Sequence, residues 1–544
     1  MPNEETINIL SNQEKYWRIL GFICLTKYID ISLCPKRKKT YFCQKFPALK
    51  RIVLLLALCC AVFFANITAL QPDIMECRNL VTAHEMATDG NWLVPTMNGE
   101  LRLEKPPLPT WIAAATETVF GENLAAQRTI PALAATLLVV FFFLFARRLT
   151  KSNTYAFIAS LLLLSCYNLI MLGRTATWDI YCHSFMMGAI YFLHRAFVPC
   201  KKDDDISSEE DVSHWADLLA AGGLMGLSFL SKGPIAFYAL LLPYLICLFY
   251  FFRPKMKGKW VPIVTAIVIC AVISSWWYIA LHILHPEATQ QVVQKETGAW
   301  TGHNVRPIWY YWRFFVEVGA ATPLMLLALA IPYWKKCLRL KREYLFAISW
   351  VLITLVLLSA FPEKKYRYLL PILPSCCLAM AFLVLHWKER GIKWVYRAVV
   401  IVAGLWAVVC IAALPAIAKM FGGENYRSIA ETRNMKQLDG IPFYCDKKNG
   451  LRIEFVYSSG RKIKEISFND TTNIQAMLPC AVLTRERIGE ELPANYWQYA
   501  DTTYLGQFDE NHHNKKDKHY TKNLIYHLTL LTNKHTGQEA STQQ

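Results

Sequence analysis

Long apolar runs recur along this chain and limit what it can fold into. Each is roughly 17 to 25 residues long, the length that an α-helix needs to cross about 30 Å of hydrocarbon. Backbone groups in lipid must be satisfied within their own segment, so we expect these runs to be helices. About eleven spans are predicted, with boundaries uncertain by a few residues. They are 52–71, 129–147, 154–173, 179–198, 215–231, 234–252, 260–283, 314–333, 344–360, 368–386 and 396–418.

The composition agrees with a membrane protein. Of the 544 residues, 54% are hydrophobic and only 18% are charged, whereas charged residues make up about a quarter of a soluble domain. A net charge of +17 is also compatible with nucleic-acid binding. However, the cations lie mainly in short loops between apolar runs, as the positive-inside rule expects. We therefore predict membrane lipids as partners and no nucleic acid.

This topology predicts three parts. Residues 1–50 form an N-terminal extension that we expect in the cytoplasm, because a basic cluster precedes the first span. Residues 51–421 form the membrane-spanning part, with a first outer loop at 72–128. An odd number of spans then puts residues 422–544 on the outer side.

Two kinds of local structure are expected outside the spans. Short amphipathic helices are predicted in the first outer loop, at 80–89 and 108–120. In the C-terminal part, the runs IPFYC, LRIEFVY, IKEISF and CAVLTRE have the length and residue types of strands, so we predict a small α/β domain.

The 17 cysteines show no spacing typical of a zinc site. Many lie within apolar runs, where cysteine behaves as a small hydrophobic residue. Cys445 and Cys480 fall in the C-terminal part, and a disulfide between them is the less favoured of two possibilities.

Several cations fall at outer loops or outer helix ends, where the positive-inside rule disfavours them. They lie beside prolines and aromatics in LEKPP, LSKGP, HNVRP and PEKKYRYLLP. Any one of them can be an ordinary surface charge. As a set, they predict an anion site that suits a polyprenyl phosphate or diphosphate, because Arg offers a planar fork and Lys a point charge. The predicted substrate-binding residues are Arg78, Lys105, Lys232, Arg306, Lys364, Lys365, Tyr366 and Arg367.

Acidic residues are few on the same side. Asp73 and Glu76 follow the first span and would share one face of a helix, and Asp179 opens a later span. All three are candidate catalytic carboxylates, although Asp73 and Asp179 can instead be helix N-caps. His303 is a lone histidine in an outer loop. One His and one Glu are too few ligands to specify a metal site on their own.

The same motifs resemble those of a known family. They are similar, in the same order, to motifs of the aminoarabinose transferases that modify lipid A, which belong with the protein O-mannosyltransferases to the integral-membrane GT-C fold. The resemblance covers roughly residues 50–420, and WLVP-x-x-NG followed by EKPP is its most specific part. The motifs are GNWLVPTMNGELRLEKPPLPTW at 90–111, GRTATWD at 173–179, LSKGP at 230–234, HNVRPIWYY at 303–311 and KKYRYLLPILP at 364–374.

The resemblance implies a mainly α-helical polytopic protein of about 11 to 13 transmembrane helices, with 51–421 as a glycosyltransferase domain. It implies that the sugar donor is an undecaprenyl-phosphate sugar and that no nucleotide cofactor is needed. It also implies that the reaction takes place on the outer side of a bacterial inner membrane. The N-terminus would be cytoplasmic and the C-terminal domain periplasmic. The acceptor stays open between lipid A, protein and glycan.

The resemblance also assigns residues. Glu104 becomes a candidate contact for one divalent metal ion together with His303, and Lys105 a phosphate contact. The family commonly has an adjacent Asp-Glu pair after the first span, but Met75 occupies the Asp position here and only Glu76 is kept. Asp73 is the nearest substitute, so the first-loop acid is left open between Asp73 and Glu76.

Two other functions fit the same features. A transporter or flippase of lipid-linked sugars would also need outer cations and a lipid-sized cavity. It would typically show two related halves and intramembrane charges midway across the bilayer, and the sequence shows neither. The third possibility is a non-catalytic scaffold whose tail binds a partner.

Overall fold

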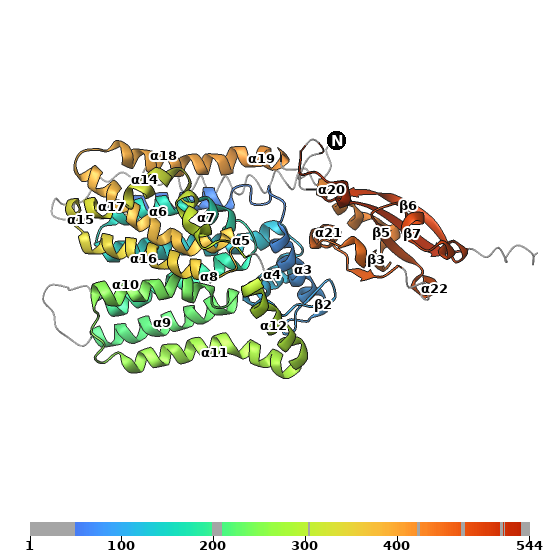
Figure 1. The fold of residues 1–544 in the computed structure, drawn as a ribbon, viewed down its shortest axis with the longest axis horizontal. Helices are drawn as coiled ribbons and strands as arrows, with labels where there is room; N and C mark the ends of the chain where they lie inside the picture. The colour runs from blue at the N-terminus through green and yellow to red at the C-terminus, as the bar shows by residue number, and fades with distance from the viewer. Residues whose placement is uncertain are drawn as a thin grey trace, which may run out of the picture. The chain divides into compact units, whose positions relative to one another are not determined.

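The computed structural model describes residues 49–198, 209–302, 305–420, 425–468, 474–511, 515 and 517–534. The chain divides into two compact units, Met1–Leu54 and Leu55–Gln544. In the first unit the described residues, 49–54, are helical, so the predicted extension 1–50 lies almost wholly outside the description. The second unit holds a helical region and a C-terminal sheet (Figure 1).

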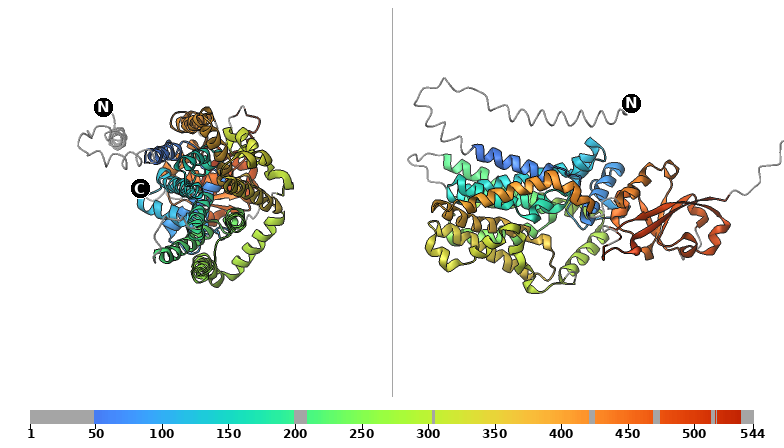
Figure 2. Two further views of the ribbon diagram at one scale, coloured as in Figure 1. Left: turned by 90° about the vertical axis from the view of Figure 1, so that its left-hand side faces the viewer. Right: turned by 90° about the horizontal axis from the view of Figure 1, so that it is seen from above.

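Five helical segments among the described residues are long and apolar enough to cross a membrane. Seen end-on, the long helices run nearly parallel to one another (Figure 2). The prediction of a mainly α-helical, multi-pass membrane protein is therefore confirmed. The five are α5 (Leu124–Thr150), α11 (Trp260–Leu284), α16 (Lys341–Ala360), η6 with α17 (Tyr366–Ile372 and Leu373–Glu389), and α18 with η7 and α19 (Trp394–Val408, Val409–Ala413 and Leu414–Met420).

Further helices complete the helical region. Helices α9 and α11 approach closely because α9 carries glycines where they meet. A Cβ on Gly222 would lie 2.5 Å from the carbonyl oxygen of Ala266, and one on Gly226 would lie 2.7 Å from Cβ of Ile273. The further helices are η2 (Cys60–Phe64), α6 (Asn153–Leu164), α7 (Tyr167–Leu172), α8 (Trp178–Phe197), α9 (Glu209–Lys232), and η3 with α10 (Phe237–Leu241 and Leu242–Phe252).

The predicted continuous span at 314–333 is wrong. This stretch is broken into short pieces, and prolines explain two of the breaks. Pro323 and Pro332 stand in the first turn of two pieces, where the missing N–H costs nothing, but each prevents a preceding helix from continuing. The pieces are α13 (Phe314–Glu317), η5 (Gly319–Ala321), α14 (Thr322–Ala328) and α15 (Ile331–Cys337).

The first outer loop contains two helices and a hairpin between them. Helix α4 (Leu108–Phe120) matches its predicted bounds, and α3 (Ile74–Asp89) begins six residues before the predicted 80–89. Strands β1 (Thr96–Met97) and β2 (Glu100–Leu101) pair antiparallel. Asn98 and Gly99 both have positive φ, as a two-residue type I′ turn requires.

This hairpin joins the outer loop to the C-terminal domain. The side-chain amide of Asn98 donates to the carbonyl of Ile463 at 2.6 Å and accepts from its N–H at 2.7 Å. On the other side, the carboxylate of Glu85 accepts the Gly99 N–H at 3.2 Å and the Thr96 hydroxyl at 2.5 Å. Polar contacts thus hold the stretch that precedes EKPP between α3 and an edge strand of the sheet.

The C-terminal domain is a five-stranded mixed sheet in the order β4-β3-β5-β7-β6. Strand β3 pairs parallel with β4 and β5, while β7 pairs antiparallel with β5 and β6. Val81 of α3 packs into the core on one face of the sheet, so the outer loop and the domain share apolar contacts. The strands are β3 (Phe443–Asp446), β4 (Ile463–Ile466), β5 (Cys480–Thr484), β6 (Ala500–Asp509) and β7 (Ile525–Asn533).

Three of the four predicted strands are confirmed, and LRIEFVY is not. Most of that run forms helix α21 (Ile453–Ser459), which ends at Gly460 with positive φ and an N–H bond to the carbonyl of Val456. The glycine signals a helix end, whereas the apolar pattern of the run resembled a strand. Strands β6 and β7 were not predicted.

Cys445 and Cys480 are free and buried. Cys445 belongs to the apolar cluster that contains Phe455 and Leu483, while Cys480 belongs to a second cluster with Val482 and Tyr496. Because Leu483 and Val482 are neighbours in one strand, the two clusters lie on opposite faces of the sheet. The disulfide considered from the sequence is therefore absent.

Candidate active site

Three helix ends bring Asp179, Lys232 and Arg367 together. Asp179 lies in the first turn of α8, Lys232 is the last residue of α9, and Arg367 lies in η6. The Lys232 ammonium contacts Oδ1 of Asp179. Nη1 of Arg367 lies 3.9 Å from Oδ2 of Asp179, and the Asp179 side chain is only 1% exposed. These residues come from GRTATWD, LSKGP and KKYRY, so the structure joins three motifs singled out in the sequence.

One side of this cluster is left unsatisfied. Among the described residues, Oδ2 of Asp179 and Nη1 of Arg367 are buried and have no hydrogen-bond partner. Buried polar atoms are normally bonded, and a missing bond to a charged group is costly. A substrate group that carries both a donor and an acceptor would suit the gap between these atoms.

Asp73 faces the same arginine and also caps a helix. Its Oδ1 accepts the N–H of Glu76 at 2.8 Å as the N-cap of α3. Its Oδ2 lies 4.0 Å from Nη2 of Arg367, and half of the Asp73 side chain is exposed. Asp179, in contrast, is no N-cap, because Thr177 occupies that position of α8. The capping alternative therefore holds for Asp73 and fails for Asp179.

Glu76 is engaged inside the protein. Its two carboxylate oxygens accept Nε and Nη2 of Arg128 at 2.8 and 2.7 Å, and Oε1 also accepts the Ala176 N–H. Both side chains of this ion pair are almost completely buried. Nη1 of Arg128 also donates to the carbonyls of Ile67 and Leu70. Glu76 thus fastens α3 to GRTATWD and, through Arg128, to α5 and the end of the first span, and we infer a structural role for this predicted catalytic residue.

The EKPP pair meets a second charge pair on α12 (Pro286–Gly302). Lys105 Nζ lies 3.2 Å from Glu296 Oε1, and Lys295 Nζ lies 3.1 Å from Glu104 Oε1. Burial alone would raise the pKa of Glu104, but hydrogen bonds from Lys295 and the backbone, with the nearby Arg102 charge, hold it below its usual value. Both partners on α12 are at least one-third exposed, so each pair is only weakly stabilising.

Two further predicted cations, Lys364 and Lys365, lie in the segment 361–368. The ammonium groups of Lys232 and Lys365 lie 5.3 and 5.9 Å from the ring centre of Tyr368. Lys365 also pairs with Glu363 at 2.6 Å. Lys364 is buried and donates to the carbonyl of Phe361, which leaves it poorly placed for a substrate.

Arg306 and Tyr366 lie beside this segment. The Arg306 N–H bonds the carbonyl of Pro362 at 3.3 Å, and its side chain is exposed. Tyr366 is also exposed, and its ring lies 5.6 Å from the guanidinium carbon of Arg367. The described part of HNVRP, from Val305 onward, therefore joins the segment before KKYRY.

Arg102 was not singled out in the sequence, yet it is buried beside this site. Its guanidinium carbon lies 5.4 Å from the ring centre of Trp178, the residue before Asp179. Burial lowers the pKa of Arg102 to about 10; Glu104 and Glu296 oppose this shift and Arg78 adds to it. Arg78 is half-buried. A signal was available, because Arg102 stands two residues before EKPP in a loop otherwise rich in apolar residues.

The proposed metal contact is only half described. His303 lies outside the described residues, and Glu104 is paired with Lys295. Within the described part of the chain, no group of three or more His, Cys, Asp or Glu residues is arranged to hold a metal ion. One carboxylate falls short of the three or four protein ligands of a typical zinc site, so no reaction step is assigned to a metal.

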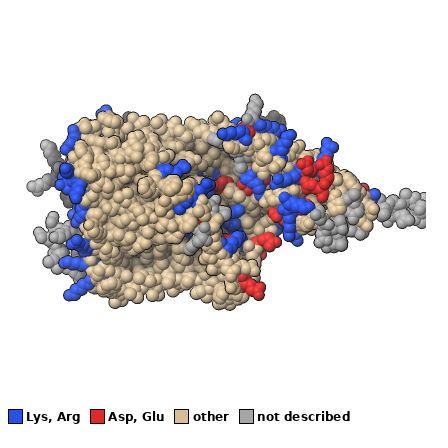
Figure 3. All heavy atoms as spheres, in the orientation of Figure 1, with Lys and Arg blue, Asp and Glu red and all other residues tan. Residues whose placement is uncertain are grey.

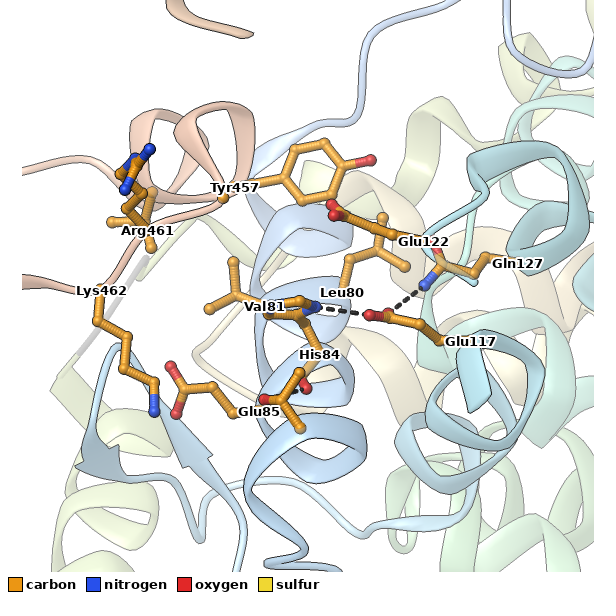
Figure 4. A pocket seen from close by; sticks show the side chains of 13 residues that line it. Leu80, Val81, His84, Glu85, Glu117, Glu122, Gln127, Tyr457, Arg461 and Lys462 are labelled. Carbon is orange, nitrogen blue, oxygen red and sulfur yellow. Dashed lines mark hydrogen bonds and ion pairs between the residues drawn. The ribbon is translucent and has the colours of Figure 1, made fainter. Parts of the chain in front are cut away.

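A separate cavity of about 190 Å³ lies between α3, α4 and α21, and none of the predicted site residues lines it. His84 and Glu117 are bonded to each other where they line it, and Tyr457 and Lys462 line it from the side of the C-terminal domain (Figure 4). Nδ1 of His84 lies 2.5 Å from Oε1 of Glu117.

Lys and Arg side chains gather at two places on the surface. In Figure 3 they lie at the left-hand end of the helical region and again near its border with the C-terminal domain, with few over the apolar middle. This is the distribution expected when helices cross a bilayer between two polar boundaries.

Comparisons with known proteins find similar sequences. The family model described as dolichyl-phosphate-mannose-protein mannosyltransferase matches residues 104–279. The chain is 28% identical over 330 residues to undecaprenyl phosphate-alpha-4-amino-4-deoxy-L-arabinose arabinosyl transferase 1 of Pseudomonas fluorescens, covering 59% of this chain and 54% of that protein. It is 25% identical over 373 residues to the corresponding transferase of Aeromonas salmonicida, covering 66% of this chain and 65% of that protein.

Solved structures share the fold. ArnT from Cupriavidus metallidurans bound to undecaprenyl phosphate superposes with a TM-score of 0.66 at 16% identity, covering 88% of this chain and 97% of that one. The matched region spans between about half and two-thirds of the curated transferases named above. The chain is therefore similar in sequence to the aminoarabinose transferases and the protein mannosyltransferases, and it shares the fold of a solved ArnT structure.

Proposed function

We propose that this protein is a glycosyltransferase that moves a sugar from undecaprenyl phosphate, or a similar polyprenyl phosphate, to an acceptor in the cell envelope. The observation that carries the proposal is the buried cluster of Asp179, Lys232 and Arg367, with one carboxylate oxygen and one guanidinium nitrogen left unbonded. Such a cluster offers an acid and fixed cations in a site of low dielectric, where charges act strongly.

The proposed reaction is one displacement at the anomeric carbon of the sugar. An acceptor oxygen forms the new bond to this carbon while the bond to the phosphate oxygen breaks, and its electron pair leaves with the polyprenyl phosphate. When the acceptor is a hydroxyl, its proton passes to a carboxylate. A phosphate acceptor is already ionised and needs only to be positioned. A single displacement predicts inversion at the anomeric carbon.

We assign the carboxylate role to Asp179 or Asp73. Both face Arg367, whereas the oxygens of Glu76 are held by Arg128. Oδ2 of Asp73 takes no part in the helix cap, and Oδ2 of Asp179 does not contact Lys232. We assign the phosphate to Lys105 with Arg306, Lys365 and Arg367, where positive charge stabilises the leaving group as the glycosidic bond breaks.

We further propose a bacterial inner membrane as the location, with the site and the C-terminal domain on the periplasmic side. The basic residues of the opposite helix ends, such as Arg148 and Lys259, bind backbone carbonyls there, in accord with a cytoplasmic boundary. Lipid A, a protein or a glycan is the proposed acceptor. Glu104 and His303 are the proposed contacts of a divalent ion, and no nucleotide is needed because the donor already carries its leaving group.

A proteoliposome assay tests the proposal against a flippase. The purified protein is reconstituted with undecaprenyl phosphate that carries a labelled sugar, and lipid A, protein and glycan acceptors are supplied in turn. The proposal expects the label on one acceptor and undecaprenyl phosphate released in equal amount. Label that crosses the bilayer while still on its carrier would instead identify a transporter.

A further inference from the structure

Three arginines are buried among the described residues, and two of them bond to protein oxygens. Arg128 is held by the Glu76 carboxylate and two carbonyls. Arg174 donates to the carbonyls of Val62, Ala65 and Asn66. Both therefore have a structural explanation, since their N–H groups complete the end of the first span.

Arg102, the third, has no comparable partner. The side-chain hydrogen bond found for it runs from Nη1 to the Met97 sulfur at 2.9 Å, and a thioether is a weak acceptor. None of the ion pairs found among the described residues contains Arg102, and the carboxylates of Glu296 and Glu104 pair with Lys105 and Lys295 instead. A buried cation without a bonded counter-charge is expensive to keep, so a folded chain is expected to retain one where it serves a ligand.

The position of Arg102 is well defined. Its backbone N–H bonds the carbonyl of Pro95 at 2.8 Å, next to the hairpin that Asn98 and Glu85 hold. One side of the guanidinium lies near the buried Trp178 ring. An aromatic face satisfies the flat surface of a guanidinium but leaves its in-plane N–H groups for an acceptor. Trp178 is followed by Asp179, so this fork lies beside the carboxylate cluster.

We propose that Arg102 and Trp178 form a separate anion position, which takes a phosphate group of a lipid substrate. This position differs from the Lys232–Arg367 group, whose cations face carboxylates. Arg78 contributes a second positive charge to it. The inference deepens the proposed function and rests on it for the identity of the lipid. The phosphate belongs either to the polyprenyl carrier or to a phosphorylated acceptor lipid, and the two are separated by experiment.

The test measures binding by the full-length protein in nanodiscs. In the first arm, undecaprenyl phosphate is titrated into the protein. In the second arm, intact lipid A is compared with lipid A whose phosphates have been removed by a phosphatase. Arg102→Gln removes the charge and keeps a polar side chain. Arg195→Gln is the matched control, because Arg195 lies at the opposite end of the same helix as Trp178 and also sits over an aromatic ring, that of Phe192.

Arg102→Gln is expected to weaken the binding of one phosphorylated lipid about tenfold to a hundredfold, which is the range for a lost charged hydrogen bond. It should leave phosphatase-treated lipid A unaffected, and Arg195→Gln should change neither arm. A loss confined to undecaprenyl phosphate assigns the carrier, and a loss confined to lipid A assigns the acceptor. Unchanged binding in both arms overturns the proposal.

Two further results keep the test decisive. If Arg102→Gln does not fold, Arg102→Lys keeps the charge but loses the planar fork, and it is expected to weaken binding about threefold to tenfold; wild-type affinity in that variant would contradict the proposal. If wild-type protein binds the lipids but transfers no sugar, a loss of binding in Arg102→Gln still supports the anion position, while the proposed transferase activity fails.

Discussion

Oδ2 of Asp179 and Nη1 of Arg367 lie 3.9 Å apart, buried, and without hydrogen-bond partners in the part of the chain that the structure describes. The distance is slightly too long for a direct bond. Each of these two opposite charges can still form a hydrogen bond. A substrate group that enters between them can therefore donate to Asp179 and accept from Arg367. A sugar hydroxyl or a phosphate oxygen with its proton has the required chemistry.

Asp179→Asn is expected to lower sugar transfer by at least about a hundredfold, the lower range for loss of a general base. The change also leaves Lys232 without its carboxylate, which destabilises a buried pair by about 3–5 kcal/mol. The double variant Asp179→Asn with Lys232→Met is therefore expected to regain stability but not transfer. Turnover measured per folded molecule, with thermal unfolding alongside, checks both parts. Recovery of transfer in the double variant would contradict a chemical role for Asp179.

Glu76→Gln is expected to act on stability instead. It breaks the buried pair with Arg128 and should cost about 3–5 kcal/mol of unfolding free energy. Folded molecules that remain should transfer sugar at close to the wild-type rate. The control is Glu76→Leu with Arg128→Met, which removes both charges and should recover much of the loss. A normal unfolding temperature combined with lost turnover would restore Glu76 as a candidate catalytic acid.

Lys105→Ala is expected to reduce turnover about tenfold to a hundredfold, because a charged hydrogen bond to the substrate phosphate is lost. Stability should change by less than about 1 kcal/mol, since the pair with Glu296 is partly exposed. Lys295→Ala is the matched control: Lys295 makes the neighbouring pair and its side chain is 71% exposed. Wild-type transfer by a well-expressed Lys105→Ala protein would remove the phosphate role.

The metal proposal is tested without an activity assay. Elemental analysis of purified wild-type protein should find a divalent ion, and its amount should fall in Glu104→Ala and in His303→Ala. Treatment with a chelator should lower the thermal unfolding temperature of wild-type protein more than that of either variant. Wild-type protein purified without a bound divalent ion would discard the proposal.

A pH dependence is expected from His84. Its hydrogen bond with Glu117 raises its pKa, and this outweighs burial, which acts in the opposite direction. The bond joins α3 to α4 at the cavity in Figure 4. Because the folded pKa is raised, this stabilisation is fully present below the unfolded value of about 6.5 and is lost as pH rises through the folded pKa. Thermal unfolding should therefore separate wild type from His84→Gln at pH 5.5 and much less at pH 9. Equal separation at both pH values would contradict this account.

Local patterns predicted the membrane fold and the motifs that meet at the site. Span length and loop charge follow from the bilayer itself, so α5, α11, α16 and α17 were visible in the sequence. LSKGP and KKYRY were grouped because their cations stood on the disfavoured side, Asp179 of GRTATWD was a candidate carboxylate, and Lys232, Asp179 and Arg367 do meet. The resemblance to a family located the EKPP loop.

Other features depended on partners far along the chain. Glu76 could not be recognised as structural, because Arg128 is 52 residues away. The contact of Arg102 with Trp178 could not be predicted, because Trp178 is distant in sequence. The LRIEFVY run carries no local signal that separates strand from helix except Gly460, which caps α21. For Glu76 and Arg102, a tertiary contact decided what the local sequence left open.

Arg367→Gln tests the central claim most directly. Transfer of labelled sugar from undecaprenyl phosphate to an accepted acceptor is measured in a single turnover, per folded molecule, for this variant and for wild type. The account predicts a loss of at least about a hundredfold, because a fixed cation beside the reacting groups is removed. Equal single-turnover rates in the two proteins would show that sugar transfer does not depend on the Asp179–Arg367 cluster.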